Sequence, residues 1–257
     1  MKPIPVTGIT ISNPMTGKDM DLNWNPSPEI DVVGYNVYRG LGPKNTDVVK
    51  LNTTLILVPM FRDTVATQRI NTRFYYTVTA VNSIAQESDK TDMFTFRMQA
   101  TDPMVWKLNE MIRRHNLMAQ FHGEDVYYFV RKTFGTRCTT CYDASQGQGH
   151  LADCPTCYGT TYVGGYVGLG LIKVVIDPPK LLMKLGTEGW MIDGRSMVGV
   201  STYPLMKNGD IIIRKTNQRY ELDSYQAYPW QGMITYQTAA LTEHPPRDYQ
   251  IFKIPTT

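Results

Sequence analysis

The chain has 257 residues, 42% of them hydrophobic, which is enough for one large domain or two small ones. Its 26 basic and 23 acidic residues leave a net charge of only +3, which counts against nucleic acid or an anionic membrane as the main partner. No stretch approaches eighteen apolar residues, and the N-terminus has no apolar signal segment. All four cysteines lie between Cys138 and Cys157, unlike the dispersed disulfides of secreted scaffolds. We therefore expect a soluble, unsecreted protein that folds in a reducing compartment.

The first segment, residues 1–97, consists of short apolar stretches separated by Pro, Gly and Asn clusters. Apolar and polar residues alternate in Asp21–Trp24, Tyr35–Tyr38 and Phe74–Ala80. Because successive side chains of a strand point to opposite faces, each stretch presents one face to a core. The segment is therefore predicted to form an all-β sandwich.

Three motifs in this segment, L-N-W-N-P-S-P, G-Y-N-V-Y-R-G and F-Y-Y-T-V-T-A-V-N-S, resemble the B, C and F strands of a fibronectin type III module. The resemblance covers about a third of the chain. It implies that Trp24 is the core tryptophan and that four residues pack around it: Tyr35, Val37, Tyr76 and Val78. Phe74 stands where the family usually has its corner tyrosine, so that hydroxyl is missing. Such modules act as spacers or surface decorations, and no function follows from the fold.

A linker, residues 98–125, contains the signals of one helix over residues 103–119. Asp102 is the expected N-cap, and Pro103 takes the first helical position, where no amide hydrogen is needed. The apolar residues recur at helical spacing and predict a buried face: Met104, Leu108, Met111, Ile112 and Met118. Arg113, Arg114 and His115 are expected on a solvated face, with phosphate contacts by the two arginines as the alternative.

The third segment, residues 126–168, carries the most specific motif, C-x2-C-x12-C-x2-C, formed by Cys138, Cys141, Cys154 and Cys157. Two C-x2-C turns place four thiolates around one point, which is the tetrahedral arrangement of structural zinc sites; two disulfides are the alternative. The second turn resembles the knuckles of zinc ribbons and one unit of the cysteine-rich region of J-domain co-chaperones. That region needs several such units, so a co-chaperone is not favoured.

A site with four thiolates leaves no open position for water, so the zinc is expected to be structural, not catalytic. His150 lies between the cysteine pairs and is interpreted as a surface-loop residue, with a role as a further ligand as the alternative. Zinc ribbons often bind nucleic acid, but residues 142–153 contain no Lys or Arg to contact phosphates. A stabilising metal centre is therefore the favoured interpretation.

The last segment, residues 169–257, again reads as strands separated by turn residues. The expected strands are 171–176, 197–203, 210–214, 219–225 and 233–238, with 215–218 as a hairpin loop. Short strands without helices between them predict a small antiparallel β-barrel or sandwich. The order N-G-D-I-I-I-R, R-Y-E-L-D-S-Y and G-M-I-T-Y-Q-T-A-A-L-T resembles the small barrels of tailed-bacteriophage neck and head-to-tail connector proteins.

No catalytic constellation is evident, so we expect no enzyme. The cysteines are assigned to metal, and the histidines, His115, His122, His150 and His244, lie in no known motif. The sequence has no G-x-S-x-G, P-loop or dinucleotide fingerprint. A glycosidase would need two carboxylates in a cleft. The available carboxylates are interpreted as solvated residues of strand ends and turns: Asp193, Asp210, Glu221 and Asp223.

The chain as a whole is expected to be mainly β, and its combination of modules suits a virion protein. The resemblance implies a structural neck or head-to-tail connector component of a tailed bacteriophage, assembled in the host cytoplasm as a ring of identical subunits. The expected partners are further copies, other neck, portal or tail proteins, no membrane, and DNA at most through a central channel. The alternatives are a zinc-ribbon module that binds nucleic acid or a regulatory partner, and an accessory glycan-binding protein.

Overall fold

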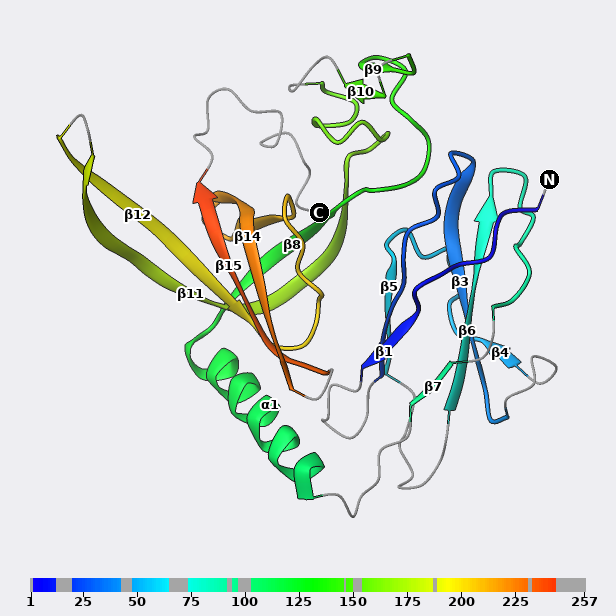
Figure 1. Cartoon of the computed structure of the whole chain (residues 1–257), viewed down its shortest axis with the longest axis horizontal. Coiled ribbons are helices and arrows are strands. Elements are labelled where there is room, and N and C mark those ends of the chain that lie inside the picture. Colours follow the sequence, from blue (N-terminus) through cyan, green and yellow to red (C-terminus); the bar gives the residue numbers. More distant parts are fainter. Residues whose placement is uncertain are drawn as a thin grey trace. The chain divides into compact units, whose positions relative to one another are not determined.

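A computed structural model of the chain describes residues 2–12, 20–42, 48–64, 74–91, 94–96, 103–145, 147–149, 154–186, 189–230 and 233–243 (Figure 1). The chain is mainly β and divides into two compact units. One unit comprises residues 1–110 and 132–167, and the other comprises residues 111–131 and 168–257. The division into four segments, 1–97, 98–125, 126–168 and 169–257, stays a prediction. Within the described ranges, no helix is both long and apolar enough to cross a membrane.

The first unit contains a fibronectin type III-like sandwich of two antiparallel sheets. One sheet has the order β1-β2-β5 (Thr10–Ser12, Met20–Asn23, Met60–Asp63). The other has the order β4-β3-β6-β7 (Val48–Lys50, Val32–Gly40, Phe74–Asn82, Phe94–Phe96). The three strands expected from the sequence motifs are thus confirmed as β2, β3 and β6.

The core of the sandwich forms around Trp24, as predicted. Trp24 is 4% exposed, and its expected neighbours Tyr35, Val37, Tyr76 and Val78 are fully buried. Phe74 packs against the same core and lies under the guanidinium of Arg39, at 5.1 Å. Aromatic and β-branched residues at alternating positions therefore place the large side chains between the two sheets.

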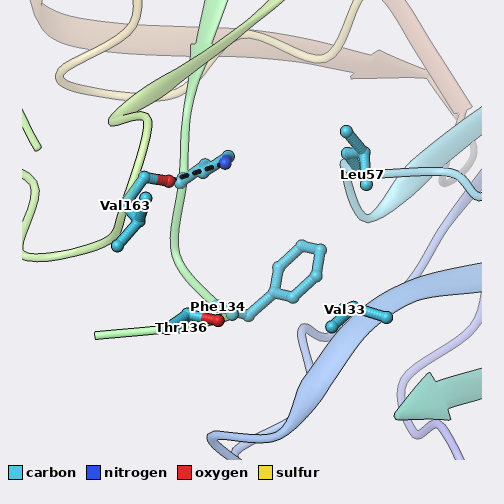
Figure 2. Close-up of a pocket in the computed structure, with 7 residues that line it drawn as sticks. Val33, Leu57, Phe134, Thr136 and Val163 are labelled. Carbon is cyan, nitrogen blue, oxygen red and sulfur yellow. Dashed lines mark hydrogen bonds between the residues drawn. The ribbon is translucent and has the colours of Figure 1, made fainter. Parts of the chain in front are cut away.

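Phe134, which lies far along the chain, completes this core. Its side chain is 5% exposed and belongs to the same buried cluster as Trp24 and Tyr35. The rings of Tyr35 and Phe134 meet edge to face, with centroids 4.9 Å apart. Figure 2 shows the Phe134 ring directed toward Val33 and Leu57 of the sandwich. The segment that carries the cysteines is thereby anchored in the sandwich core.

Helix α1 (Pro103–His122) is confirmed, while Asp102 lies outside the described residues. Leu108 and Ile112 are buried, as the apolar stripe predicts, but Met118 is 40% exposed. Arg113 and Arg114 are exposed as expected. His115 does not lie on a solvated face, because its ring stacks on Tyr236 with centroids 4.3 Å apart, and burial lowers its pKa. Tertiary packing therefore shifts the buried face of the helix toward His115.

The second unit contains a closed antiparallel barrel with the order β11-β12-β15-β14-β13-β8. Its strands are Tyr166–Gly186, Gly189–Val200, Met233–Glu243, Arg219–Trp230, Ile211–Arg214 and Glu124–Arg131, in that order. All five strands expected after residue 169 are present, most of them longer than expected. Pro178 and Pro179 fall at a register shift in β11, between Asp177 and Lys180, so the strand continues past residues that cannot donate to the ladder.

Strand β8 was not expected, because residues 126–168 were all assigned to the cysteine segment. Val126, Tyr128 and Val130 alternate along it and are buried, and the strand pairs with β13 in the barrel. The expected strand 197–203 ends early, since β12 stops at Val200 and a loop follows. The alternation of Val126, Tyr128 and Val130 is a local strand signal, which the assignment of these residues to the cysteine segment left unused.

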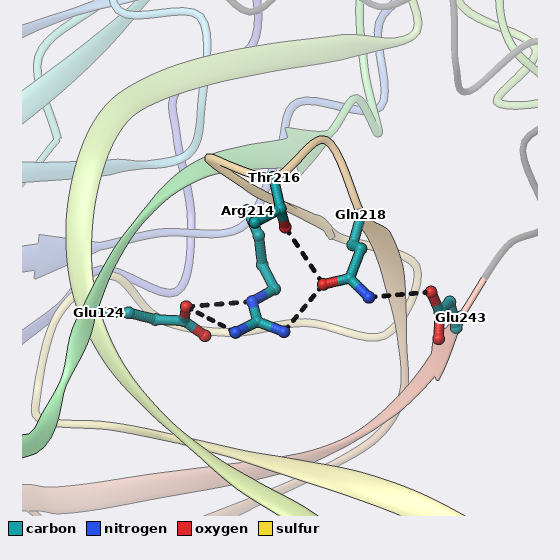
Figure 3. Close-up of polar contacts among 5 residues, drawn as sticks. All are labelled: Glu124, Arg214, Thr216, Gln218 and Glu243. Atoms are coloured by element: carbon teal, nitrogen blue, oxygen red, sulfur yellow. Dashed lines mark hydrogen bonds and ion pairs between the residues drawn. The ribbon is translucent and has the colours of Figure 1, made fainter.

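The predicted hairpin loop 215–218 joins β13 to β14 and is held by polar contacts (Figure 3). The Arg214 guanidinium donates from Nε to Glu124 Oε2 at 3.0 Å and from its Nη1 to Gln218 Oε1 at 2.9 Å. Gln218 Nε2 reaches Glu243 Oε1 at 3.5 Å. These contacts connect β8, the loop and β15, and so fix the register at this end of the barrel.

Candidate metal centre

The four cysteines predicted as ligands come together in the first unit. Cys154 and Cys157 are completely buried, and Cys138 and Cys141 are 1% exposed. Their Sγ atoms all lie within 4.8 Å of one another. The Sγ atoms of Cys138 and Cys154 are 3.7 Å apart, and those of Cys141 and Cys157 are 3.2 Å apart. These separations exceed the S–S bond length of about 2.05 Å, and the first is close to the value of about 3.8 Å that follows from four sulfurs in a tetrahedron 2.3 Å from zinc.

Two similar turns position the thiols. The amide of Tyr142 donates to the Cys138 carbonyl at 3.1 Å, and that of Tyr158 donates to the Cys154 carbonyl at 2.8 Å. Gly165 closes the segment with a φ of +58°, and a Cβ there would lie 2.6 Å from the Cys157 carbonyl oxygen. Only glycine fits this approach.

The surroundings of Cys154 favour its ionised form, the thiolate. Burial opposes ionisation of Cys154, yet the amides of Thr156 and Cys157 and the neighbouring thiols hold its pKa down at about 6. Burial raises the pKa of Cys141 and Cys157. A bound cation would favour the thiolate at all four positions, since thiolates are the form that binds metal.

Arg137 contacts residues on both sides of the cysteine cluster, a role that the sequence did not indicate. Its guanidinium carbon lies 4.6 Å from the centroid of the Tyr142 ring and 4.1 Å from that of the Tyr162 ring. The same group donates to Thr161 Oγ1 at 2.8 Å. The amide of Cys138 donates to the Thr161 carbonyl at 2.9 Å, which pairs the two chain segments that enter and leave the centre. His150 lies outside the described residues.

Of the carboxylates considered for catalysis, the side chain of Asp193 lies outside the described part of the structure, and Asp210 and Asp223 have different surroundings. Asp210 is not solvated as expected: it is completely buried and accepts from Tyr128 Oη at 2.6 Å, the Arg131 amide at 2.9 Å and the Lys207 amide at 3.0 Å. Asp223 is exposed and accepts from Thr242. Asp210 therefore serves to hold the loop that precedes β13.

The buried Asp210 predicts a pH dependence of stability. Burial raises its pKa from 3.8 to about 6, so protonation favours the folded state. Its contribution is fully present below pH 3.8 and is lost as the pH rises through about 6, a difference of about 3 kcal/mol. In urea titrations from pH 7 to 4, the wild type should gain stability relative to Asp210→Asn by up to this amount. A constant difference would contradict the assignment.

Comparisons with known proteins give weak structural similarities that cover less than half of the chain. No family model matches the chain, and no curated protein matches it. Among solved structures it is similar to an Fn3-like protein from Clostridium thermocellum, with 22% identity, 40% of this chain and 99% of that chain covered, and a TM-score of 0.33. It is also similar to a myokine, with 10% identity, 38% of this chain and 99% of that chain covered, and a TM-score of 0.32. At such scores these similarities carry no argument about function, and the fibronectin type III-like description rests on the strand order given above.

Proposed function

We propose that this chain is a structural, non-catalytic subunit of a tailed-bacteriophage virion, in the neck or head-to-tail connector, that works as a ring of identical copies. Other neck, portal or tail proteins would be its further partners, and DNA would pass through the channel. The sequence resemblance of the last segment to connector barrels motivates the proposal. The closed six-stranded barrel agrees with the architecture that this resemblance implies.

The observation that supports assembly is a ribbon that continues beyond the barrel. Strand β12 pairs with β15 only over Ser196–Val200, whereas β11 and β12 stay paired to their ends at Gly186 and Gly189. In Figure 1 this ribbon runs away from the other barrel strands. Residues 189–195 of β12 therefore lie outside its pairing with β15. A two-stranded ribbon alone is marginally stable in water, so a strand from a neighbouring copy would stabilise it.

Repeating one such contact head to tail closes a ring when the rotation fits. Electron microscopy and light scattering of the purified protein should therefore show a closed oligomer. Shortening the ribbon by replacing residues 181–194 with a tight turn should release monomers. As a control, Leu171→Ser, which changes an exposed residue of the same strand β11, should leave the oligomer intact. A monomeric full-length protein, or rings that survive the shortening, would refute the proposal.

We further propose that the four-cysteine centre holds one structural Zn²⁺. Four buried thiols suit zinc because zinc accepts a sulfur tetrahedron without geometric strain and leaves no position for substrate. Elemental analysis of protein prepared under reducing conditions should give one zinc per chain. Replacing Cys154 and Cys157 by Ser should abolish it, and another metal at full stoichiometry, or two disulfides, would contradict the assignment.

A further inference from the structure

A pocket of about 280 Å³ lies within the first unit, between the sandwich and the cysteine segment. Its apolar walls are Val33 and Leu57 from the sandwich and Phe134 and Val163 from the cysteine segment (Figure 2). Phe134 is 5% exposed, whereas Leu57 and Val163 are 42% and 41% exposed. The pocket is therefore apolar and open to solvent, with two hydrophobic side chains left partly uncovered.

One cation, Lys132, belongs to the lining of this pocket. Its Nζ donates to the Val163 carbonyl oxygen at 2.7 Å. The other lining residues, Gly135 and Thr136, carry no charge, and no carboxylate of the described residues forms an ion pair with Lys132. Burial lowers the pKa of Lys132. An ammonium group in this position can donate further hydrogen bonds to an incoming anion.

The residues that line the pocket restrict the kind of ligand that it can bind. A half-buried ammonium beside apolar walls complements a group that is apolar on one side and carboxylate on the other. The volume is at the small end of ligand pockets, enough for one side chain and not for a large cofactor. The exposed Leu57 and Val163 would stay uncovered by a small free acid but would be covered by the chain that continues from a bound peptide residue.

We propose that this pocket binds the C-terminus of a partner polypeptide that ends in an apolar residue. The terminal side chain packs against Phe134, Val33 and Leu57, and the terminal carboxylate accepts a hydrogen bond from Lys132 Nζ. Capture of a chain terminus through its carboxylate is an established mode of peptide recognition. The site would give the first unit a docking function that does not depend on the ring of barrels.

The test uses two peptides that differ in one group: acetyl-Gly-Gly-Leu with a free carboxylate and the same peptide as its C-terminal amide. Calorimetric titration of the full-length protein should show the acid binding about tenfold more tightly, the equivalent of one charge-assisted hydrogen bond. Lys132→Met should remove the difference by weakening the acid alone. Leu57→Ser, at a partly exposed position, should weaken both peptides equally because it removes apolar contact.

Lys2→Met is the matched control, since Lys2 is an exposed lysine of the same unit that pairs with Asp89. It should leave the preference for the acid unchanged. Equal binding of acid and amide would overturn the proposal, as would a preference that survives Lys132→Met. Failure of both peptides to bind at millimolar concentration would also overturn it. None of these results bears on whether the barrels form a ring.

Discussion

Replacing Phe134 by Ala is expected to lower the free energy of unfolding of the sandwich by about 3–5 kcal/mol. The ring is almost completely buried, meets Tyr35 edge to face and belongs to the same core as Trp24. Its removal leaves a cavity among side chains held by two sheets, which cannot collapse freely. Amide hydrogen exchange in β3 and β6 reports the effect locally, because those strands form the sheet against which the ring packs.

Phe121→Ala provides the matched control for this substitution. The Phe121 side chain is 77% exposed, so the same chemical change removes little buried area and should alter stability by no more than about 0.5 kcal/mol. If exchange in β3 and β6 is equally fast in wild type and Phe134→Ala, the ring does not stabilise the sandwich. The anchoring of the cysteine segment in the core would then be wrong.

Removal of the metal is expected to destabilise the sandwich as well, although no cysteine lies within it. Phe134 lies four residues before Cys138, so we expect that metal binding at the cysteines helps to hold its ring in the core. Adding a chelator under reducing conditions should therefore accelerate exchange in β3 and β6 by up to the factor found for Phe134→Ala. The variant with Cys154 and Cys157 replaced by Ser should behave like the chelated protein.

The effects of metal removal and of Phe134→Ala on exchange in the sandwich should not add. If metal acts on the sandwich through Phe134, chelation of Phe134→Ala should change exchange in β3 and β6 little, because the contact is already lost. Exchange in the barrel strands β13 and β14 serves as the internal control, since those strands belong to the other unit. Released metal with unchanged exchange in the sandwich of the wild type would contradict the linkage.

A fragment of residues 1–97 is expected to fold alone, because the predicted sandwich has its own core tryptophan, Trp24. Such a fragment keeps Trp24, Tyr35 and the strands of both sheets but lacks Phe134. Its stability should therefore resemble that of the Phe134→Ala protein. A fragment that remains disordered would show that the ring is required for folding and not only for stability.

The sequence by itself determined the elements whose information is local. Alternation around Trp24, Tyr35 and Tyr76 specified strands and a core, because a strand repeats every two residues. The spacing of the cysteines specified the four-cysteine cluster, since each C-x2-C turn already directs two thiols to one side. Pro103 likewise placed the start of α1, because proline favours the first turn of a helix.

Only the tertiary structure decided which segments meet. Phe134 reads as a lone aromatic residue before the cysteines, and its place in the sandwich core depends on a fold that joins positions about a hundred residues apart. Asp210 resembles a turn residue, yet closure of the barrel buries it beneath Tyr128 and the loop before β13. Strand β8 lies between β13 and β11 and closes the barrel, so that it pairs with strand edges that would otherwise stay open. Local periodicity can mark a strand or a helix but not the distant segment that it packs against, so these contacts appear only when the elements pack.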